Sequence, residues 1–150
     1  MVAIRPKAVV ENRSWWSQNR EPETVSEPVP ILKDEEREHR IPSQWRPKLR
    51  EIADGLKDQN YRLEGIADVD PLDDATAAGI ARNIEEYGCT LASLSDVSWD
   101  TSVCQWQLTY WEVLVDLFTV EEGRSDLVLH IRVFEQEGGF LFKVHFVYVP

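Results

Sequence analysis

The sequence lacks any run of apolar residues that could cross a membrane, and it has few cysteines. A membrane-spanning helix needs about 18 or more consecutive apolar residues, and no such run occurs. Proline and charged residues fall within the first seven positions, so we expect no secretory signal there. Cys89 and Cys104 are too few for a disulfide framework. We therefore expect a cytoplasmic protein with reduced thiols and no membrane partner.

Common catalytic and cofactor-binding motifs are also missing. The chain has no GxSxG nucleophile elbow, no HExxH zinc motif, no phosphate loop and no dinucleotide fingerprint. We expect no cofactor and no bound metal. These absences argue against the common enzyme classes, but they leave open whether the protein is an enzyme.

Positive charge is scarce. The 16 Lys and Arg residues face 27 Asp and Glu residues, which gives a net charge of -11 at pH 7. Nucleic acid and anionic membranes are therefore poor partners. A basic protein is a better one, although the same acidity also keeps a protein soluble without serving any partner.

Regular apolar patterning is present in residues 110–149. Three apolar-rich runs alternate with two turn signals, at Gly123 and at Gly138, which predicts an antiparallel β-meander. If Gly123 closes a three-residue loop at positive φ, paired residue numbers in the first hairpin add up to about 244. One face of the meander is then apolar: Trp111, Val113, Val115, Leu117, Leu127, Leu129, Ile131, Val133, Phe140, Phe142, Val144, Phe146 and Tyr148.

The other face of the predicted meander is mixed. It aligns Glu112, Arg132 and Lys143 across the three strands and sets His130 opposite His145. This face is too apolar for a purely solvated surface. We expect a loop, the N-terminal segment or a partner to cover part of it.

Helical periodicity precedes the meander. Residues 43–59 predict a first helix capped by Ser43, and a second helix is predicted with Asp73 as its N-cap and Gly88 as its stop. The predicted fold is α+β, with two N-terminal helices packed on a four- to five-stranded antiparallel sheet that ends in the C-terminal β-meander.

The predicted domain occupies residues 43–150 and follows a Pro- and Glu-rich arm at residues 1–42. We expect this arm to be poorly ordered or loosely docked. Trp15 and Trp16 are its exception, because adjacent tryptophans are unusual in a polar segment. They either pack back onto the mixed face or anchor another protein.

The turn residues Arg124, Ser125 and Asp126 are the first candidate site. Ser125 or Asp126 can accept backbone N–H bonds across the turn, and Arg124 can pair with a neighbouring acid at the rim. Structure therefore explains most of this string. The functional alternative is a loop that presents charge to a ligand or partner.

Two further groups of residues are candidates for chemistry. His130, His145 and Asp116 form a weak acid–base or metal candidate, because their proximity depends on strand register and no motif supplies a further ligand. A pocket between helices and sheet is the other possibility, with buried packing as the simpler interpretation. Its candidate residues are Trp99, Cys104 and Trp106.

Several segments together resemble a bacterial family known only as a domain of unknown function. They are IPSQWRPKLREI at 41–52, EEYGCTL at 85–91, SWDTSVCQW at 98–106, YWEVLVDLFTVEEGRSDLVLHIRVFE at 110–135 and VHFVYVP at 144–150. The resemblance covers about residues 41–150 and implies an α+β domain of two helices and a meander. It implies no activity, cofactor or catalytic residue.

These observations favour a non-catalytic, acidic protein-interaction module of the inhibitory or immunity kind. We expect a monomer or weak homodimer whose partner is another protein, with a basic one preferred. The alternative is a small enzyme or ligand-binding protein with a pocket between helices and sheet. A closed pocket with converging polar groups favours this alternative, whereas a flat acidic or aromatic patch favours the interaction module.

Overall fold

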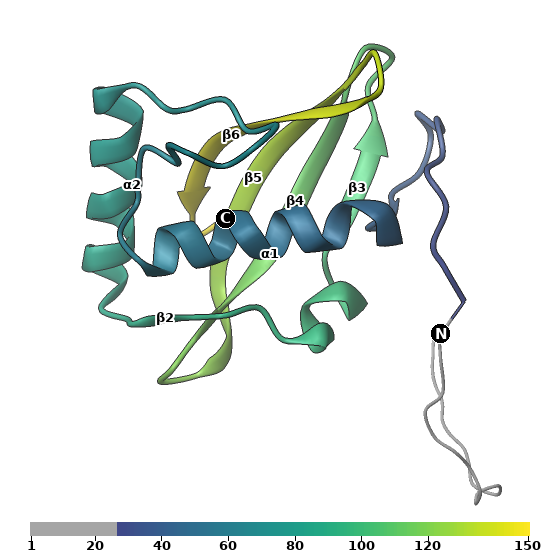
Figure 1. The fold of residues 1–150 in the computed structure, drawn as a ribbon. Coiled ribbons are helices and arrows are strands. Elements are labelled where there is room, and N and C mark those ends of the chain that lie inside the picture. Colours follow the sequence, from purple (N-terminus) through teal and green to yellow (C-terminus); the bar gives the residue numbers. More distant parts are fainter. Residues whose placement is uncertain (1–26) are drawn as a thin grey trace, which may run out of the picture.

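The computed structural model describes residues 27–150 and contains two α-helices and one six-stranded sheet (Figure 1). Trp15 and Trp16 lie outside the described residues. Two short 3-10 helices, Ser43–Trp45 and Asp96–Asp100, accompany the main elements. The main helices and strands, in chain order, are β1 (His39–Arg40), α1 (Arg46–Lys57), α2 (Asp74–Tyr87), β2 (Leu91–Ala92), β3 (Val103–Trp106), β4 (Trp111–Thr119), β5 (Gly123–Gln136) and β6 (Gly139–Tyr148).

The strands follow the order β1-β3-β4-β5-β6, and β2 pairs with the far end of β4. All the pairings between these strands are antiparallel. The predicted α+β class, with two helices and a mostly antiparallel sheet, is confirmed. The finer prediction is wrong in two respects, because short strands β1 and β2 raise the strand number to six and β1 precedes both helices.

The first hairpin has the predicted register over most of its length. Trp111 pairs with Val133 and Asp116 with Val128, which gives the expected sum, and Gly123 has φ 76°. Nearer the turn the register shifts at a bulge after Asp116. A bulge places extra residues on one strand and tightens the local twist.

A second irregularity, between His130 and Ile131 in the pairing with β6, changes the prediction for the end of that strand. Slipping the register by one residue exchanges the two faces. Val147 is therefore fully buried, while Phe146 and Tyr148 are only half-buried. The prediction that Tyr148 continues the apolar face was wrong, because the alternating pattern cannot reveal a bulge and its ring lies against His130 instead. Phe146 still packs against the core cluster, as predicted.

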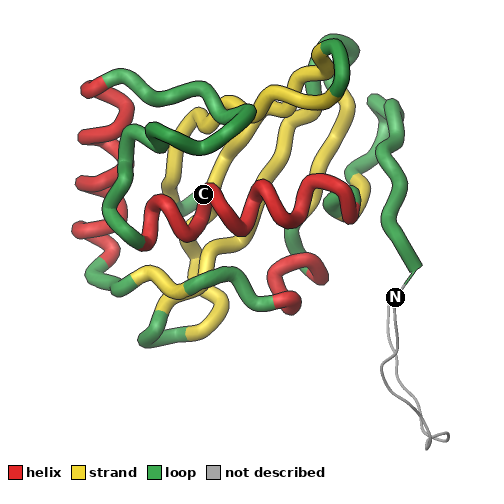
Figure 2. Tube along the Cα trace, in the orientation of Figure 1, coloured by secondary structure: helices red, strands yellow, loops and turns green. Residues whose placement is uncertain are grey.

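Helix α1 crosses one face of the sheet (Figures 1 and 2). The Trp45 ring, just before the helix, meets the edges of Trp111 and Phe140 at centroid distances of 5.1 and 5.5 Å. The helix buries Leu49, Ile52, Ala53 and Leu56 in the same core. Ser43 does not cap it, contrary to expectation. A 3-10 turn begins there instead, and the Ser43 hydroxyl accepts a hydrogen bond from the Val29 N–H at 2.7 Å.

Helix α2 packs along the β6 edge, so the two helices do not share one face as predicted (Figure 1). Gly79 allows this approach, because a Cβ atom there would lie 3.0 Å from the Phe146 ring. The Asn83 amide donates to the Val147 carbonyl at 2.8 Å. The predicted ends of the helix are confirmed: Asp73 accepts from the Thr76 N–H, and Gly88 has φ 77°.

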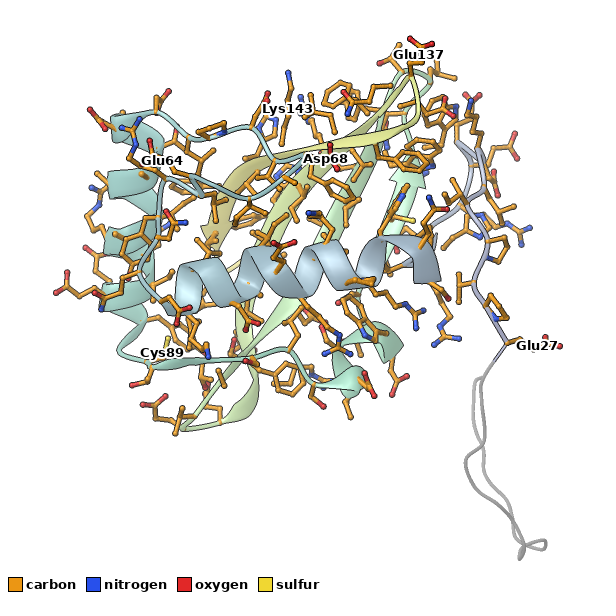
Figure 3. The ribbon with its side chains drawn as sticks, viewed as in Figure 1. Glu27, Glu64, Asp68, Cys89, Glu137 and Lys143 are labelled. Atoms are coloured by element: carbon orange, nitrogen blue, oxygen red, sulfur yellow. The ribbon has the colours of Figure 1, made fainter. Side chains whose placement is uncertain are left out.

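Earlier parts of the chain pair with strands at both sides of the sheet. The α1–α2 connector runs beside β6, where Val69 forms a parallel bridge with Phe142 and the Asp68 carbonyl accepts from the Phe142 N–H (Figure 3). At the other side, β1 pairs with β3, and the Leu32 carbonyl accepts from the Trp111 indole at 2.9 Å. Such covering prevents an edge strand from pairing with another chain.

Candidate interaction face of the sheet

The side of the sheet turned away from α1 carries no helix in the described part of the chain (Figure 1). None of its apolar side chains belongs to the buried core cluster. We call this surface the open face. It comprises Tyr110, Glu112, Leu114, Val128, His130, Arg132, Phe134, Leu141, Lys143, His145 and Tyr148.

A carboxylate between two nitrogen donors forms the centre of the open face. Glu112 pairs across the strands with Arg132, and its Oε1 accepts from Arg132 Nε at 3.1 Å and from His130 Nε2. Burial alone would raise the pKa of Glu112, but the hydrogen bonds and charges of His130 and Arg132 outweigh it and lower that pKa. The predicted alignment of Glu112, Arg132 and Lys143 across the sheet is confirmed.

The two histidines meet beside this centre. The rings of His130 and His145 stack with centroids 5.2 Å apart, and the Tyr148 ring meets His130 at 6.4 Å. Burial lowers the pKa of His145, and the charges of Arg132 and His130 lower it further. Asp116 is not part of this group, because its carboxylate accepts from the Thr101 hydroxyl. Among residues 27–150, no three His, Cys, Asp or Glu side chains converge as metal ligands.

Aromatic and cationic side chains alternate at one end of the open face. The Tyr110 and Phe134 rings lie 5.3 Å apart, with the Arg132 guanidinium 4.7 Å from Tyr110 and the Lys143 ammonium 5.1 Å from Phe134. Lys143 also reaches the Asp70 carboxylate at 3.5 Å. Cation–π contacts of this kind hold the stems of these long side chains against the rings.

The turn residues face different environments. Ser125 is buried, and its hydroxyl donates to the Leu117 carbonyl at 2.8 Å while accepting the Leu127 N–H. It therefore satisfies the backbone at the bulge. Arg124 and Asp126 are exposed and line a hollow of about 460 Å³ that also reaches Asp116.

The three pocket candidates lie in different surroundings. Cys104 is buried, and burial raises the pKa of its thiol to about 12, which removes the thiolate needed of a nucleophile. Trp106 lies against Trp111, with ring centroids 4.4 Å apart. Trp99 is also buried, beneath the guanidinium groups of Arg46 and Arg50 in the wall of a separate cleft.

Residues 53–150 match a family model described as "Domain of unknown function (DUF7668)". The chain belongs to this family. No curated protein and no solved structure matches it. The family match begins inside α1 and extends to the end of the chain, so it includes every residue of the open face. The segment before it contributes β1, the first 3-10 helix and the start of α1.

Sequence reasoning missed two features of this family member. The Tyr110–Phe134 pair was not singled out, although the predicted register already places these residues opposite each other. The cleft arginines were also missed, although Arg46 and Arg50 stand one helical turn apart.

In residues 27–150, neither helix has the length and apolar composition that a membrane span requires.

Proposed function

We propose that this chain is a non-catalytic, acidic protein-interaction module that binds its partner through the open face. The observation that carries this proposal is an extensive half-buried apolar and aromatic surface that no described element covers. Apolar surface of this kind is a common property of protein-binding sites. The proposed setting is the cytoplasm, where two free thiols remain reduced.

The composition of the open face fits a binding site. Tyrosine and arginine are enriched among the residues that dominate binding energy, and Tyr110 and Arg132 stand next to each other here. The side chains of Glu112, His130 and Arg132 are only 28%, 20% and 32% exposed. Because they already hold one another in place, a partner would order few additional rotamers on binding.

Charge indicates the kind of partner. Within the open face, Glu112 is opposed by Arg132 and Lys143, so the acid surplus of the chain lies elsewhere. A net charge of -11 would accelerate encounter with a basic protein, while the balanced open face would form the contact itself. An inhibitory or immunity-type role is consistent with this division between steering and contact.

The experiment compares two substitutions that each place an arginine on the surface. Phe134→Arg adds it to the open face, whereas Val120→Arg adds it at an apolar residue of the turn that is already 69% exposed. Partners are captured from the source cells with the full chain, and their affinity is then measured with purified protein. We expect Phe134→Arg to weaken binding at least about tenfold, as an interface hot spot would.

The control and the contrary outcomes are distinct. Val120→Arg should bind the partner as the unsubstituted chain does. Equal binding by both variants would place the interface elsewhere and overturn the proposal. Analytical ultracentrifugation tests a second copy as the partner. A concentration-dependent mass that Phe134→Arg abolishes would make the open face a homodimer interface.

A further inference from the structure

A cleft of about 550 Å³ lies between the start of α1 and the 3-10 helix Asp96–Asp100. Three arginines, Arg40, Arg46 and Arg50, contribute to its lining in a chain whose net charge is -11. We propose that this arginine cleft binds the phosphate group of a small molecule. The cleft shares no residue with the open face, so this site is independent of the proposed protein interaction.

Arg46 is the central residue of the arginine cleft. Its Nε and Nη2 donate to the Ile41 carbonyl at 3.1 and 2.9 Å, and its guanidinium lies 5.4 Å from the Trp99 ring. These contacts fix its orientation. No carboxylate of residues 27–150 forms a salt bridge with it. Burial lowers the pKa of Arg46, and the charges of Arg40 and Arg50 lower it further, against the opposing charges of Asp96 and Asp100 in the same cleft. A partly desolvated cation beside another cation gains from a bound anion.

The carboxylates that pair with the other two arginines are exposed. Arg50 donates to the Leu94 carbonyl at 2.7 Å and contacts Asp96, whose side chain is 90% exposed. Arg40 lies 4.0 Å from the carboxylate of Asp100, which is 67% exposed. Exposed ion pairs of this kind contribute little and rearrange easily. An incoming anion can therefore replace either aspartate without breaking the fold.

The position of Arg46 in its helix supports the same conclusion. It is the first residue of α1, and the first turn contains no acidic side chain. The start of a helix carries partial positive charge, so a cation there is placed unfavourably. An acidic protein has many carboxylates that could occupy this turn instead. A ligand anion would neutralise both the helix end and the arginines.

Phosphate fits this arrangement better than a carboxylate does. Guanidinium groups recognise phosphate through paired N–H donors, and a tetrahedral group offers separate oxygens to donors that approach from different elements. Here the arginines come from β1 and from two turns of α1. The cleft also falls within the size range of small-molecule sites, which leaves room for the rest of a phosphate monoester.

The test is a titration of the full chain followed through the arginine Nε–H resonances in ¹⁵N NMR spectra. The probes are inorganic phosphate, O-phosphoserine and acetate, each at constant ionic strength maintained with sodium chloride. We expect saturable shifts for Arg46 and Arg50 with a dissociation constant of about 1 mM or below for phosphate, and weaker binding of acetate. Tighter binding of O-phosphoserine than of inorganic phosphate would identify a monoester as the ligand source, and the reverse order would identify free phosphate.

Three variants make the assignment specific. Arg46→Lys keeps the charge but loses the guanidinium N–H donors that the Ile41 carbonyl leaves free, and it should weaken phosphate binding about tenfold. Asp96→Asn removes a competing carboxylate and should strengthen binding. The matched control Arg124→Gln removes one arginine charge at an exposed position and should bind as the unsubstituted chain does.

Two results would overturn the proposal. Shifts that fail to saturate, or that sodium chloride reproduces, would show only general charge screening. Equal affinity for acetate and phosphate would remove the phosphate assignment. Circular dichroism verifies that each variant is folded, and Asp96→Asn still provides the decision if Arg46→Lys does not fold.

Discussion

The two faces of the sheet are built from alternate residues of the same strands, yet they have different surroundings. On the face beneath α1, Trp111, Val113 and Ile131 are completely buried. On the open face, their chain neighbours Glu112, Leu114 and Arg132 remain partly exposed. The first face therefore supplies most of the packing energy of the domain. The second is free to carry side chains that serve binding, because the fold does not depend on excluding water from it.

Polar interactions divide in the same way. Hydrogen-bonded ionisable side chains gather on the open face around Glu112, whereas the buried core cluster contains only apolar residues and Cys104. A buried charge would need full compensation, but a half-exposed one is partly stabilised by water. The hydrogen bonds among Glu112, His130 and Arg132 can therefore rearrange without destabilising the core.

The largest expected effect comes from truncating one side chain on each face. Ile131→Ala should lower the free energy of unfolding by about 2–5 kcal/mol, because it leaves a cavity in the core. Phe134→Ala on the open face should cost under about 1.5 kcal/mol, because that ring is only partly buried. Denaturant unfolding measures both. Equal losses would show that the open face is covered in solution.

The turn that sets the register of both faces gives the next effect. Gly123 has φ 76°, so Gly123→Val should destabilise the domain by about 1–3 kcal/mol through backbone strain. Gly139 is the control, because its φ is not positive and a Cβ there would meet nothing within 4 Å. Thermal unfolding should show little change for Gly139→Val. A similar loss in both variants would rule out strain at Gly123 as the cause.

Adjacent turn residues should then differ from each other. Ser125→Ala leaves the Leu117 carbonyl and the Leu127 N–H without their buried partner, and should cost about 1–2 kcal/mol. Arg124→Ala should cost under about 0.5 kcal/mol, because the side chain is exposed. The comparison is measured by denaturant unfolding. A larger loss of stability for Arg124→Ala than for Ser125→Ala would contradict the view that the Ser125 hydrogen bonds are the main stabilising contacts of this turn.

The smallest effect is the pH dependence of the open face. The folded state lowers the pKa of His145 below 6.5 through burial and the charges of Arg132 and His130. The unfolded chain therefore binds the proton more readily, and stability should fall as pH drops below 6.5, levelling off below the folded pKa. Glu112, whose pKa is also lowered, loses its stabilising contribution only as pH falls below 4.5.

Two measurements check this prediction. An NMR titration should place the midpoint of His145 below 6.5. Thermal unfolding of His145→Gln should depend less on pH in this range than that of the unsubstituted chain. An unchanged pH dependence in the variant would show that His145 is not its source.

The sequence predicted what depends on local pattern. Alternation gave the meander and its register up to Asp116, and capping chemistry gave Asp73 and Gly88. It could not predict the bulges at Asp116 and after His130. The apolar and polar residues alternate in the sequence whether or not the pairing slips by one residue, but the slip exchanges the two faces. The sequence could therefore predict that one face of the sheet is half-apolar, but it could not predict that Tyr148 lies on that face.

Contacts between distant segments account for most of what was missed. The arginine cleft joins β1, α1 and residues 96–100, and no periodicity relates these segments. The same holds for Ser43, whose hydroxyl serves Val29 rather than its own helix. Such partners are chosen by tertiary packing after the local elements form. Sequence reasoning had identified Trp99 but could not show that two arginines would lie over it.

The contacts between early segments and the late strands have a consequence for synthesis on the ribosome. The Trp111 indole is bonded to a carbonyl 79 residues earlier, and the Val147 carbonyl to an amide 64 residues earlier. The segments that contain these partners, Leu32 and Asn83, are therefore synthesised well before the strands that they contact. Until β6 is available, β5 lacks its neighbouring strand on that side. The α1–α2 connector then also lacks the strand with which Val69 forms its bridge. We expect released chains truncated before residue 139 to be open to protease and to chaperones, and chains that include β6 to resist both.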